Sequence, residues 1–263
     1  MNETTDDAPL GHVRDGALAV LTLNRPTRFN CLSRGLLDAL DRALATIADD
    51  PATRAVLIRG AGKHFCTGAD LDEVLAARDD PAAMRAFVER GHAVFRHLEQ
   101  LAKPTVAAVQ GLALAGGLEL LLCCDLVVMG RSARIGDQHA RYGLHPAWGS
   151  SVRLPRLVGR RRALDLLYSA RWLDAAEALS WGLVNEVVDD DALDAGARGL
   201  ATRLAGGNPD ANAFVKAMSE FALDNDLDAA LARESAGAAA GLMSTNTGRG
   251  LAAFQAREEP RFE

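Results

Sequence analysis

The chain has 263 residues, with 29 Lys and Arg against 35 Asp and Glu, so its formal net charge is −6. An acidic balance argues against a nucleic-acid partner, because such binders gain affinity by neutralising phosphates. Hydrophobic residues at 49% and charged residues at 24% are typical of a globular protein, and the length favours one large domain, alone or with a helical appendage.

The N-terminal stretch 1–11 is acidic and lacks a basic start followed by an apolar run. It therefore does not resemble a signal or transit peptide, and we expect a disordered tail. The side chains of residues 17–23 alternate in character and include β-branched residues, a pattern that predicts a strand. This strand ends at Asn24-Arg25-Pro26. Apolar residues at helical spacing predict a helix over 32–47, with Ser33 as its cap.

The middle of the chain alternates strands and helices. Residues 55–59 predict a short buried strand, followed by a glycine-bearing loop and a helix that begins near Asp70. A long helix is predicted over 81–101, ending before Lys103-Pro104, since proline disfavours helix in the residue before it. Residues 105–110 predict another buried strand. This alternation indicates an α/β layered domain with parallel strand pairing.

Residues 111–130 are apolar over about the length that a bilayer crossing needs. They contain Glu119 and Asp125, and each acid would cost about 2.5–3.5 kcal/mol near the centre of a membrane helix. We therefore expect no membrane contact. The segment instead predicts a turn over 111–117, an apolar helix over 118–124 and a strand over 125–129. After Val188 the pattern changes to Ala-rich helices starting near residues 193, 212 and 227, without a convincing strand.

Four cysteines are present, Cys31, Cys66, Cys123 and Cys124. They form no C-x-x-C motif, and no Cys and His spacing suits zinc. We therefore expect neither a disulfide framework nor a metal site. A reduced, cytoplasmic setting follows from the same reasoning.

Two segments carry the residues best suited to chemistry. Residues 63–71, K-H-F-C-T-G-A-D-L, lie between a strand end and a helix start, where unpaired backbone amides form an anion site. The same segment also fits an ordinary turn with Asp70 near the helix start. In residues 110–125, Gly116 and Gly117 open a helix whose first turn contains Glu119.

That second segment would place amides and a carboxylate around one small space. Such an arrangement suits enolate chemistry, because amides hold negative charge on a carbonyl oxygen while the carboxylate moves a proton on the adjacent carbons. The alternative for Glu119 is an acid stabilised by the helix macrodipole.

In their order and separation, these segments and three further motifs resemble the crotonase family of enoyl-CoA hydratases and isomerases. The motifs are N-R-P at 24–26, F-C-T-G-A-D-L at 65–71, K-P-T-V-A-A-V-Q-G at 103–111, A-G-G-L-E-L-L-L-C-C-D at 115–125 and A-L-S-W-G-L-V-N-E-V-V at 178–188. The resemblance implies an α/β fold with a crotonase-like spiral of repeated β-β-α units over 12–190. It also implies a helical C-terminal trimerisation region over 191–263, and a homotrimer or hexamer.

The resemblance further implies an acyl-CoA thioester substrate, with coenzyme A entering as part of the substrate and no separate cofactor. The amides of Ala69 and Gly116 would form an oxyanion hole, and Glu119 would be the first catalytic acid. Trp148 stands where relatives have small glycines and is expected beside the acyl pocket, unless it only packs the core. Residues expected to line the coenzyme A site are Thr27, Arg28, Phe29, Cys31, Thr67, Asp70 and Leu71.

Hydratases of the family carry a second glutamate, and the segment I-G-D-Q-H places His139 at that position. A histidine with its usual pKa near 6.5 can exchange protons and position water, and Asp137 is a candidate to orient it. A hydrogen-bonded structural histidine is the alternative. The leading prediction is an enoyl-CoA hydratase, a lyase of fatty acid metabolism. Because the second glutamate is absent, an enoyl-CoA delta-isomerase and a catalytically silent acyl-CoA-binding homologue remain alternatives.

Overall fold

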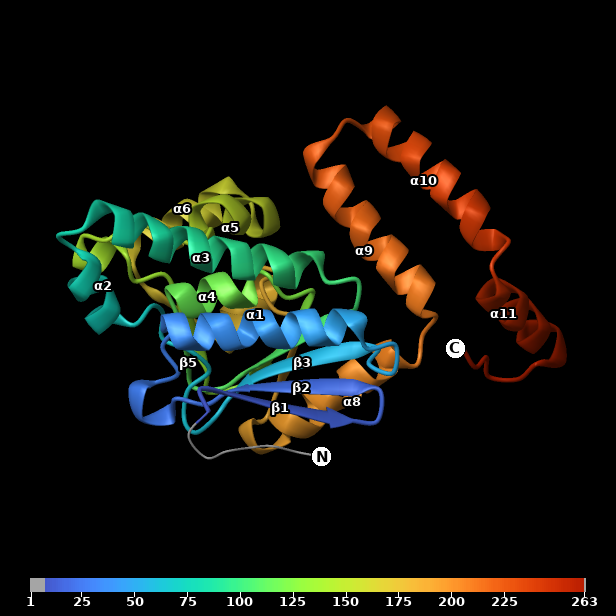
Figure 1. Ribbon diagram of the computed structural model, residues 1–263, viewed down its shortest axis with the longest axis horizontal. Helices are drawn as coiled ribbons and strands as arrows, with labels where there is room; N and C mark the ends of the chain where they lie inside the picture. The colour runs from blue at the N-terminus through green and yellow to red at the C-terminus, as the bar shows by residue number, and fades with distance from the viewer. Residues whose placement is uncertain (1–7, 263) are drawn as a thin grey trace.

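The central element of the protein is a mixed β-sheet, seen in the computed structural model, which describes residues 8–262 (Figure 1). Within those residues the sheet has the strand order β1-β2-β3-β4-β6-β9. Its strands are β1 Leu10–Asp15, β2 Leu18–Leu23, β3 Ala55–Gly60, β4 Thr105–Val109, β6 Leu126–Gly130 and β9 Glu186–Val188. β1 and β2 pair antiparallel, and the later strands all pair parallel. The predicted parallel α/β core is confirmed.

A second, smaller sheet contains β5 Leu112–Leu114, β7 Arg134–Gly136 and β8 Trp172–Asp174. Successive turns of the chain therefore give one strand to each sheet and then a helix, as in β4, β5 and the following helix α4. The loop after β3 joins the small sheet through a parallel bridge between Cys66 and Ala113. These strands were not predicted from the sequence, because three residues are too few to show an alternation of apolar and polar side chains.

Two helices begin at caps that the sequence predicts. The Ser33 hydroxyl accepts a hydrogen bond from the Leu36 amide at the start of α1, and Asp70 accepts one from the Asp72 amide at the start of α2. The helices are α1 Arg34–Asp49, α2 Leu71–Ala77, α3 Pro81–Gln100, α4 Gly116–Leu121, α5 Ser150–Val158, α6 Arg160–Ser169, α7 Ala175–Ser180, α8 Leu193–Ala205, α9 Pro209–Asp224, α10 Leu227–Leu242 and α11 Thr245–Ala256.

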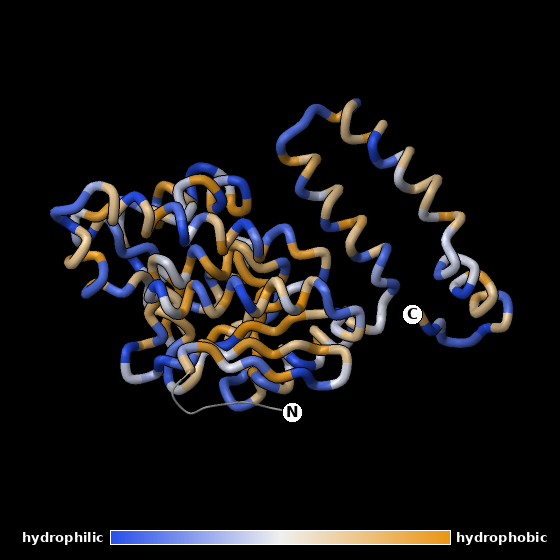
Figure 2. The backbone as a smooth tube through the Cα atoms, viewed as in Figure 1, coloured by the Kyte–Doolittle hydropathy of each residue, from blue (hydrophilic) through white to orange (hydrophobic). Residues whose placement is uncertain are grey.

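Helices cover both faces of the large sheet, with α1 and α3 on one side and α8 on the other (Figure 1). Apolar residues are concentrated along the strands between these layers (Figure 2). α8 buries Leu193, Ala197 and Ala201 against β2, β3, β4 and β6, and its small alanines permit close packing. The packed core therefore continues to Ala205, beyond the boundary expected at residue 190.

The C-terminal helices α9, α10 and α11 extend away from the sheet (Figure 1). From residue 189 to residue 262 the chain is helical or irregular, in agreement with the sequence pattern. The tail expected over 1–11 lies mostly outside the described residues, but Leu10 and Gly11 already pair with β2. None of the helices between residues 8 and 262 is both long and apolar enough to cross a membrane.

Candidate active site

Backbone pairing brings together the two segments that the sequence analysis singled out. The Cys66 amide donates to the Leu112 carbonyl at 3.1 Å, and the Leu114 amide donates to the Cys66 carbonyl at 3.0 Å. The loop after β3 therefore runs beside β5, which leads directly into α4. A Cβ at Gly117 would lie 2.1 Å from the Cys66 carbonyl oxygen, so only glycine permits this close approach.

The amides of Ala69 and Gly116 lie in adjoining turns. Leu32 bonds to the Gly68 carbonyl and the Asp70 amide, an alternation that turns the Ala69 amide to the opposite side. Gly116 is the first residue of α4, where an amide has no acceptor within the helix. Neither amide donates a hydrogen bond within residues 8–262. A Cβ at Gly116 would lie 3.2 Å from the Gly68 Cα, so the two turns are in contact.

The turn into α4 contains an unusual backbone conformation. Ala115 has φ 49° and ψ −116°, in a region that residues with a Cβ rarely adopt. Such conformations persist only where the surrounding structure holds them, and they are concentrated at functional sites. Here the strained residue directly precedes the Gly116 amide.

Glu119 is fully buried in the first turn of α4. Its Oε1 accepts hydrogen bonds from the Trp148 amide at 2.8 Å and the Ser150 amide at 3.0 Å. Its Oε2 is buried and has no hydrogen-bond partner within the described part of the chain. An unpaired buried acceptor costs about 1–3 kcal/mol, and such an atom is therefore a candidate for contact with a substrate.

His139 is connected to Glu119 through two hydrogen-bonded residues. Its ring contacts Asp137, which accepts a hydrogen bond from the Ser150 hydroxyl, and the Ser150 amide donates to Glu119. The side chain of His139 is 11% exposed, and its Nδ1 lies 2.9 Å and 3.0 Å from the two oxygens of Asp137. Burial alone would lower the pKa of His139, but the hydrogen bond and charge of Asp137, with the charge of Glu119, raise this pKa above its usual value. The Asp137–His139 contact considered from the sequence is present.

Burial opposes ionisation of Asp137, but its contacts with His139 and the Ser150 hydroxyl hold the pKa of this carboxyl below its usual value. The pair is therefore an ionised carboxylate beside a histidine that tends to be protonated. Ser150 was not singled out in the sequence, where its only signal is a position at the start of α5 after Gly149.

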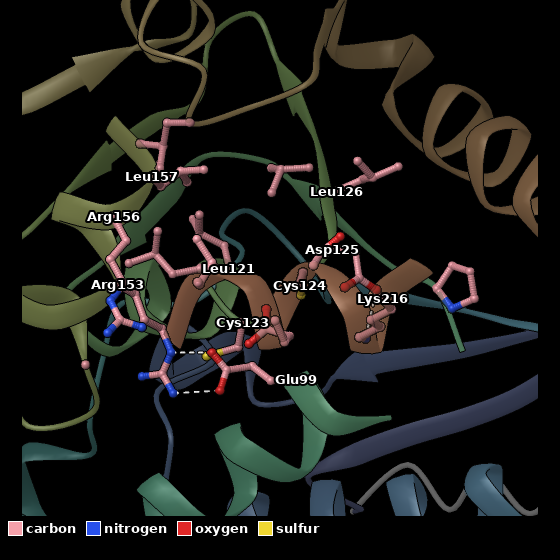
Figure 3. Close-up of a pocket in the computed structure, with 18 of the residues that line it drawn as sticks. Glu99, Leu121, Cys123, Cys124, Asp125, Leu126, Arg153, Arg156, Leu157 and Lys216 are labelled. Carbon is pink, nitrogen blue, oxygen red and sulfur yellow. Dashed lines mark hydrogen bonds and ion pairs between the residues drawn. The ribbon is translucent and has the colours of Figure 1, made fainter. Parts of the chain in front are cut away.

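The loop that bonds to Glu119 is supported from α3 and α5. Arg153 donates through Nη1 to the Trp148 carbonyl at 2.7 Å. It also donates through Nη2 to Glu99 at 2.9 Å (Figure 3). This ion pair borders a cleft of about 870 Å³ between α9 and the core (Figure 3). None of the predicted site residues lines that cleft.

Trp148 fills the space between α3 and the turn into α4. The side chain is 1% exposed, and its ring centroid lies 5.3 Å from that of Phe87 and 5.7 Å from that of Phe95. A Cβ at Gly116 would lie 2.9 Å from the indole ring. Trp148 therefore packs in the core and lies beside Gly116, and its place at the acyl pocket stays a prediction.

The residues expected around coenzyme A form an exposed rim with two buried members. Thr27, Arg28, Phe29 and Leu71 are exposed, and Thr67 is half-buried, its amide donating to the Phe29 carbonyl at 3.2 Å. Asp70 and Cys31 are buried beneath this rim. The positions are adjacent, and their role as coenzyme A contacts stays a prediction.

Asp70 has contacts that explain its burial. It pairs with Arg25 at 2.8 Å, accepts a hydrogen bond from the Cys31 thiol at 3.4 Å, and caps α2. Burial opposes ionisation of Asp70, but these hydrogen bonds hold its pKa below the usual value. Asp70 and Cys31 thus fix the shape of the loop under the rim.

The possible metal ligands are scattered. Among the residues that the structure describes, no three His, Cys, Asp or Glu side chains are placed to hold a metal ion. The four cysteines are all free thiols.

Comparison with known proteins places the chain in a family. Residues 14–263 match the family model described as enoyl-CoA hydratase/isomerase. A short-chain-enoyl-CoA hydratase of Clostridium acetobutylicum is 38% identical over 223 residues, covering 84% of this chain and 85% of that protein. A crotonyl-CoA hydratase of Syntrophomonas wolfei is 35% identical over 252 residues, covering 95% of both chains.

Solved structures agree with this assignment. The crystal structure of an enoyl-CoA hydratase from Bacillus anthracis superimposes with a TM-score of 0.93 at 32% identity, covering 97% of this chain and 98% of that one. The predicted crotonase-like spiral is therefore confirmed. From its sequence and its fold, the chain belongs to the enoyl-CoA hydratase/isomerase family of the crotonase superfamily.

Proposed function

We propose that this protein is an enoyl-CoA hydratase, a lyase that adds water to a 2-enoyl-CoA thioester and yields a 3-hydroxyacyl-CoA. The observation that carries the proposal is that Ser150 links buried Glu119, whose Oε2 is unpartnered in the described chain, to Asp137, which holds the ring of His139. Two proton-transfer groups beside two amides meet the needs of hydration. The hydratase names of the relatives support the same reaction.

The proposed reaction proceeds through an enolate. The thioester carbonyl accepts hydrogen bonds from the Ala69 and Gly116 amides, which stabilise negative charge on its oxygen. The water oxygen bonds to C3 while Glu119 Oε2 takes a proton from that water. The C2–C3 π electrons move toward the carbonyl, and C2 then receives the proton of His139 Nε2. The net change is addition of one water across the double bond.

The raised pKa of His139 and the hydrogen bonds of Glu119 suit these roles. The raised pKa of His139 keeps the imidazolium populated near neutral pH, as an acid that protonates C2 requires. The Trp148 and Ser150 amides hold Oε1 of Glu119 and leave Oε2 as the oxygen placed to take a proton from water. A proton must return from Glu119 to His139 after each turnover, which exchange with solvent can supply.

Trp148 supports a short acyl group as the substrate. Its indole occupies the space beside the Gly116 amide, where the acyl chain would lie if the thioester carbonyl bonds to that amide. The rim of Thr27, Arg28, Phe29, Thr67 and Leu71, with Asp70 and Cys31 beneath it, is the proposed coenzyme A contact. The reaction moves only water and protons, so we propose no cofactor apart from the coenzyme A of the substrate.

The test measures hydration of 2-enoyl-CoA thioesters from four to sixteen carbons, through loss of the conjugated absorbance and detection of the 3-hydroxy product. We expect crotonyl-CoA to be hydrated fastest and the rate to fall with length. Trp148→Ala is expected to shift the substrate preference toward longer acyl chains. The variant removes the indole but keeps the hydrogen bond from the backbone amide of residue 148 to Glu119. Trp148→Met refills part of the volume of the indole, so its chain-length preference should lie between those of the unmodified protein and Trp148→Ala.

The alternatives give different results in the same assay. Conversion of 3-enoyl-CoA to 2-enoyl-CoA without hydration would indicate the isomerase, which needs only one proton-carrying carboxylate. Binding without turnover at every chain length would indicate the silent acyl-CoA-binding homologue. An unchanged length preference in folded Trp148→Ala and Trp148→Met would remove Trp148 from the acyl site.

We also propose that the protein is a cytoplasmic homotrimer, or a hexamer of two trimers, without a nucleic-acid or membrane partner. Exposed apolar side chains on α9, α10 and α11 and the segment after α10 support assembly through these helices. They include Val215, Leu223, Leu227, Leu231, Leu242, Met243, Leu251 and Phe254. Sedimentation equilibrium should give the mass of three or six chains, and Phe254→Asp with Leu231→Asp should lower it. A monomeric mass for the unmodified protein would contradict the proposal.

A further inference from the structure

One buried residue connects the two proton-transfer groups of the site. Ser150 is fully buried at the first position of α5. Its amide donates to Glu119 Oε1 at 3.0 Å, and its hydroxyl donates to Asp137 Oδ2 at 2.7 Å. Since amide and hydroxyl belong to one residue, the positions of Glu119 and Asp137 are fixed relative to each other.

The contacts of Asp137 determine which ring nitrogen of His139 carries a proton. Asp137 Oδ1 accepts a hydrogen bond from the His139 amide at 3.1 Å, and both its oxygens face His139 Nδ1. An ionised carboxylate can only accept hydrogen bonds, so Nδ1 must be the donor. The neutral ring then has its lone pair on Nε2, which makes no hydrogen bond within the described residues.

We propose that Asp137 and Ser150 are positioning residues for the hydration step. Asp137 fixes the Nδ1–H tautomer and the orientation of His139, and Ser150 holds this pair at a set position relative to Glu119. The inference rests on the proposed function and deepens it. It explains how a histidine replaces a carboxylic acid: the ring bonds to Asp137 through Nδ1, which leaves Nε2 as the atom that carries the transferred proton.

The charges around the ring support this division of roles. The charged groups acting on His139 are Asp137, through a direct hydrogen bond, and Glu119, at longer range. Both favour the imidazolium over the neutral ring. Removing the charge of Asp137 should therefore lower the pKa of His139 and turn it into a weaker proton carrier at neutral pH.

The experiment compares four variants of the full-length protein. Asp137→Asn keeps the shape of the side chain but removes its charge. Ser150→Ala removes the hydroxyl and retains the hydrogen bond from the backbone amide to Glu119. Ser150→Thr retains both the hydroxyl and that hydrogen bond. The exposed neighbour Ser151 supplies the matched control Ser151→Ala. For each protein we would measure kcat and KM for crotonyl-CoA hydration against pH, and the protonation of His139 by ¹⁵N nuclear magnetic resonance.

Asp137→Asn is expected to lower kcat by about 10²-fold or more with a few-fold change in KM, because a catalytic histidine loses the carboxylate that sets its tautomer. The alkaline fall of its pH profile should move to lower pH together with the measured pKa of His139. Ser150→Ala should lower kcat by about tenfold, as for one lost hydrogen bond to a charged group. Ser150→Thr, which keeps the hydroxyl, should recover most of the activity lost in Ser150→Ala, and Ser151→Ala should match the unmodified protein.

Two results would overturn the inference while leaving the hydratase proposal standing. One is an unchanged pH profile and His139 pKa in Asp137→Asn. The other is an Nε2–H tautomer for neutral His139 in the unmodified protein, a measurement that needs no variant to fold. Absence of hydration by the unmodified protein would instead reject the proposed function.

Discussion

Glu119→Gln is expected to lower the turnover of crotonyl-CoA by about 10²–10⁴-fold, the range for loss of a general acid or base. Gln keeps the size of the side chain, and its carbonyl oxygen can accept the hydrogen bonds from Trp148 and Ser150 that Oε1 accepts. The remaining atom becomes an amide nitrogen, which cannot take a proton from water. Binding of the thioester should therefore stay within a few-fold while chemistry slows.

Steady-state and single-turnover rates of hydration, together with a dissociation constant for the product, would separate binding from chemistry. Glu89→Gln is the matched control, because Glu89 is an exposed carboxylate on α3 and should leave turnover unchanged. Full turnover in a folded Glu119→Gln variant would remove Glu119 from the reaction.

His139→Ala is expected to abolish hydration of crotonyl-CoA while leaving Glu119-driven proton exchange, or the shift from 3-enoyl to 2-enoyl, largely intact. The reason is that the ring supplies the C2 proton in hydration, whereas double-bond migration can use one carboxylate. His139→Gln tests the same point with less disturbance, since its amide can still donate to Asp137 but cannot transfer a proton. Hydration and double-bond migration should be measured on all variants.

His139→Glu should retain or raise hydration. The new carboxyl would face Asp137 across the distance now spanned by His139, and two carboxylates so close cannot both ionise. One of them is therefore expected to stay protonated at neutral pH and to serve as the acid.

The pH dependence of hydration follows from the raised pKa of His139. Because the imidazolium is the form that donates, hydration should be fast below this pKa and should fall as pH rises through it. Any residual hydration by His139→Ala or His139→Gln should lack that alkaline limb. Equal hydration by the unmodified protein and His139→Ala would reject the mechanism with two proton-transfer groups, and would favour an isomerase or a water held by backbone groups.

The local structure can be predicted from the sequence wherever the signal is contained in a few neighbouring residues. Ser33 and Asp70 mark helix starts because a cap bonds to an amide two or three positions away. Strands β3, β4 and β6 are recognisable because both faces are buried, which requires a continuous apolar run. The motifs around Ala69 and Glu119 were specific enough to indicate the family before any geometry was known.

The groups that surround the reacting atoms are brought together by contacts between distant parts of the chain. The hydrogen bonds on Glu119 Oε1 come from the amides of Trp148 and Ser150, about thirty positions along the chain. Every residue except proline has such an amide, so no side-chain pattern can reveal this contact. α8 was likewise expected in the helical appendage, because an Ala-rich sequence predicts a helix but does not indicate what that helix packs against. Its packing on the sheet depends on distant strands that leave space for small side chains.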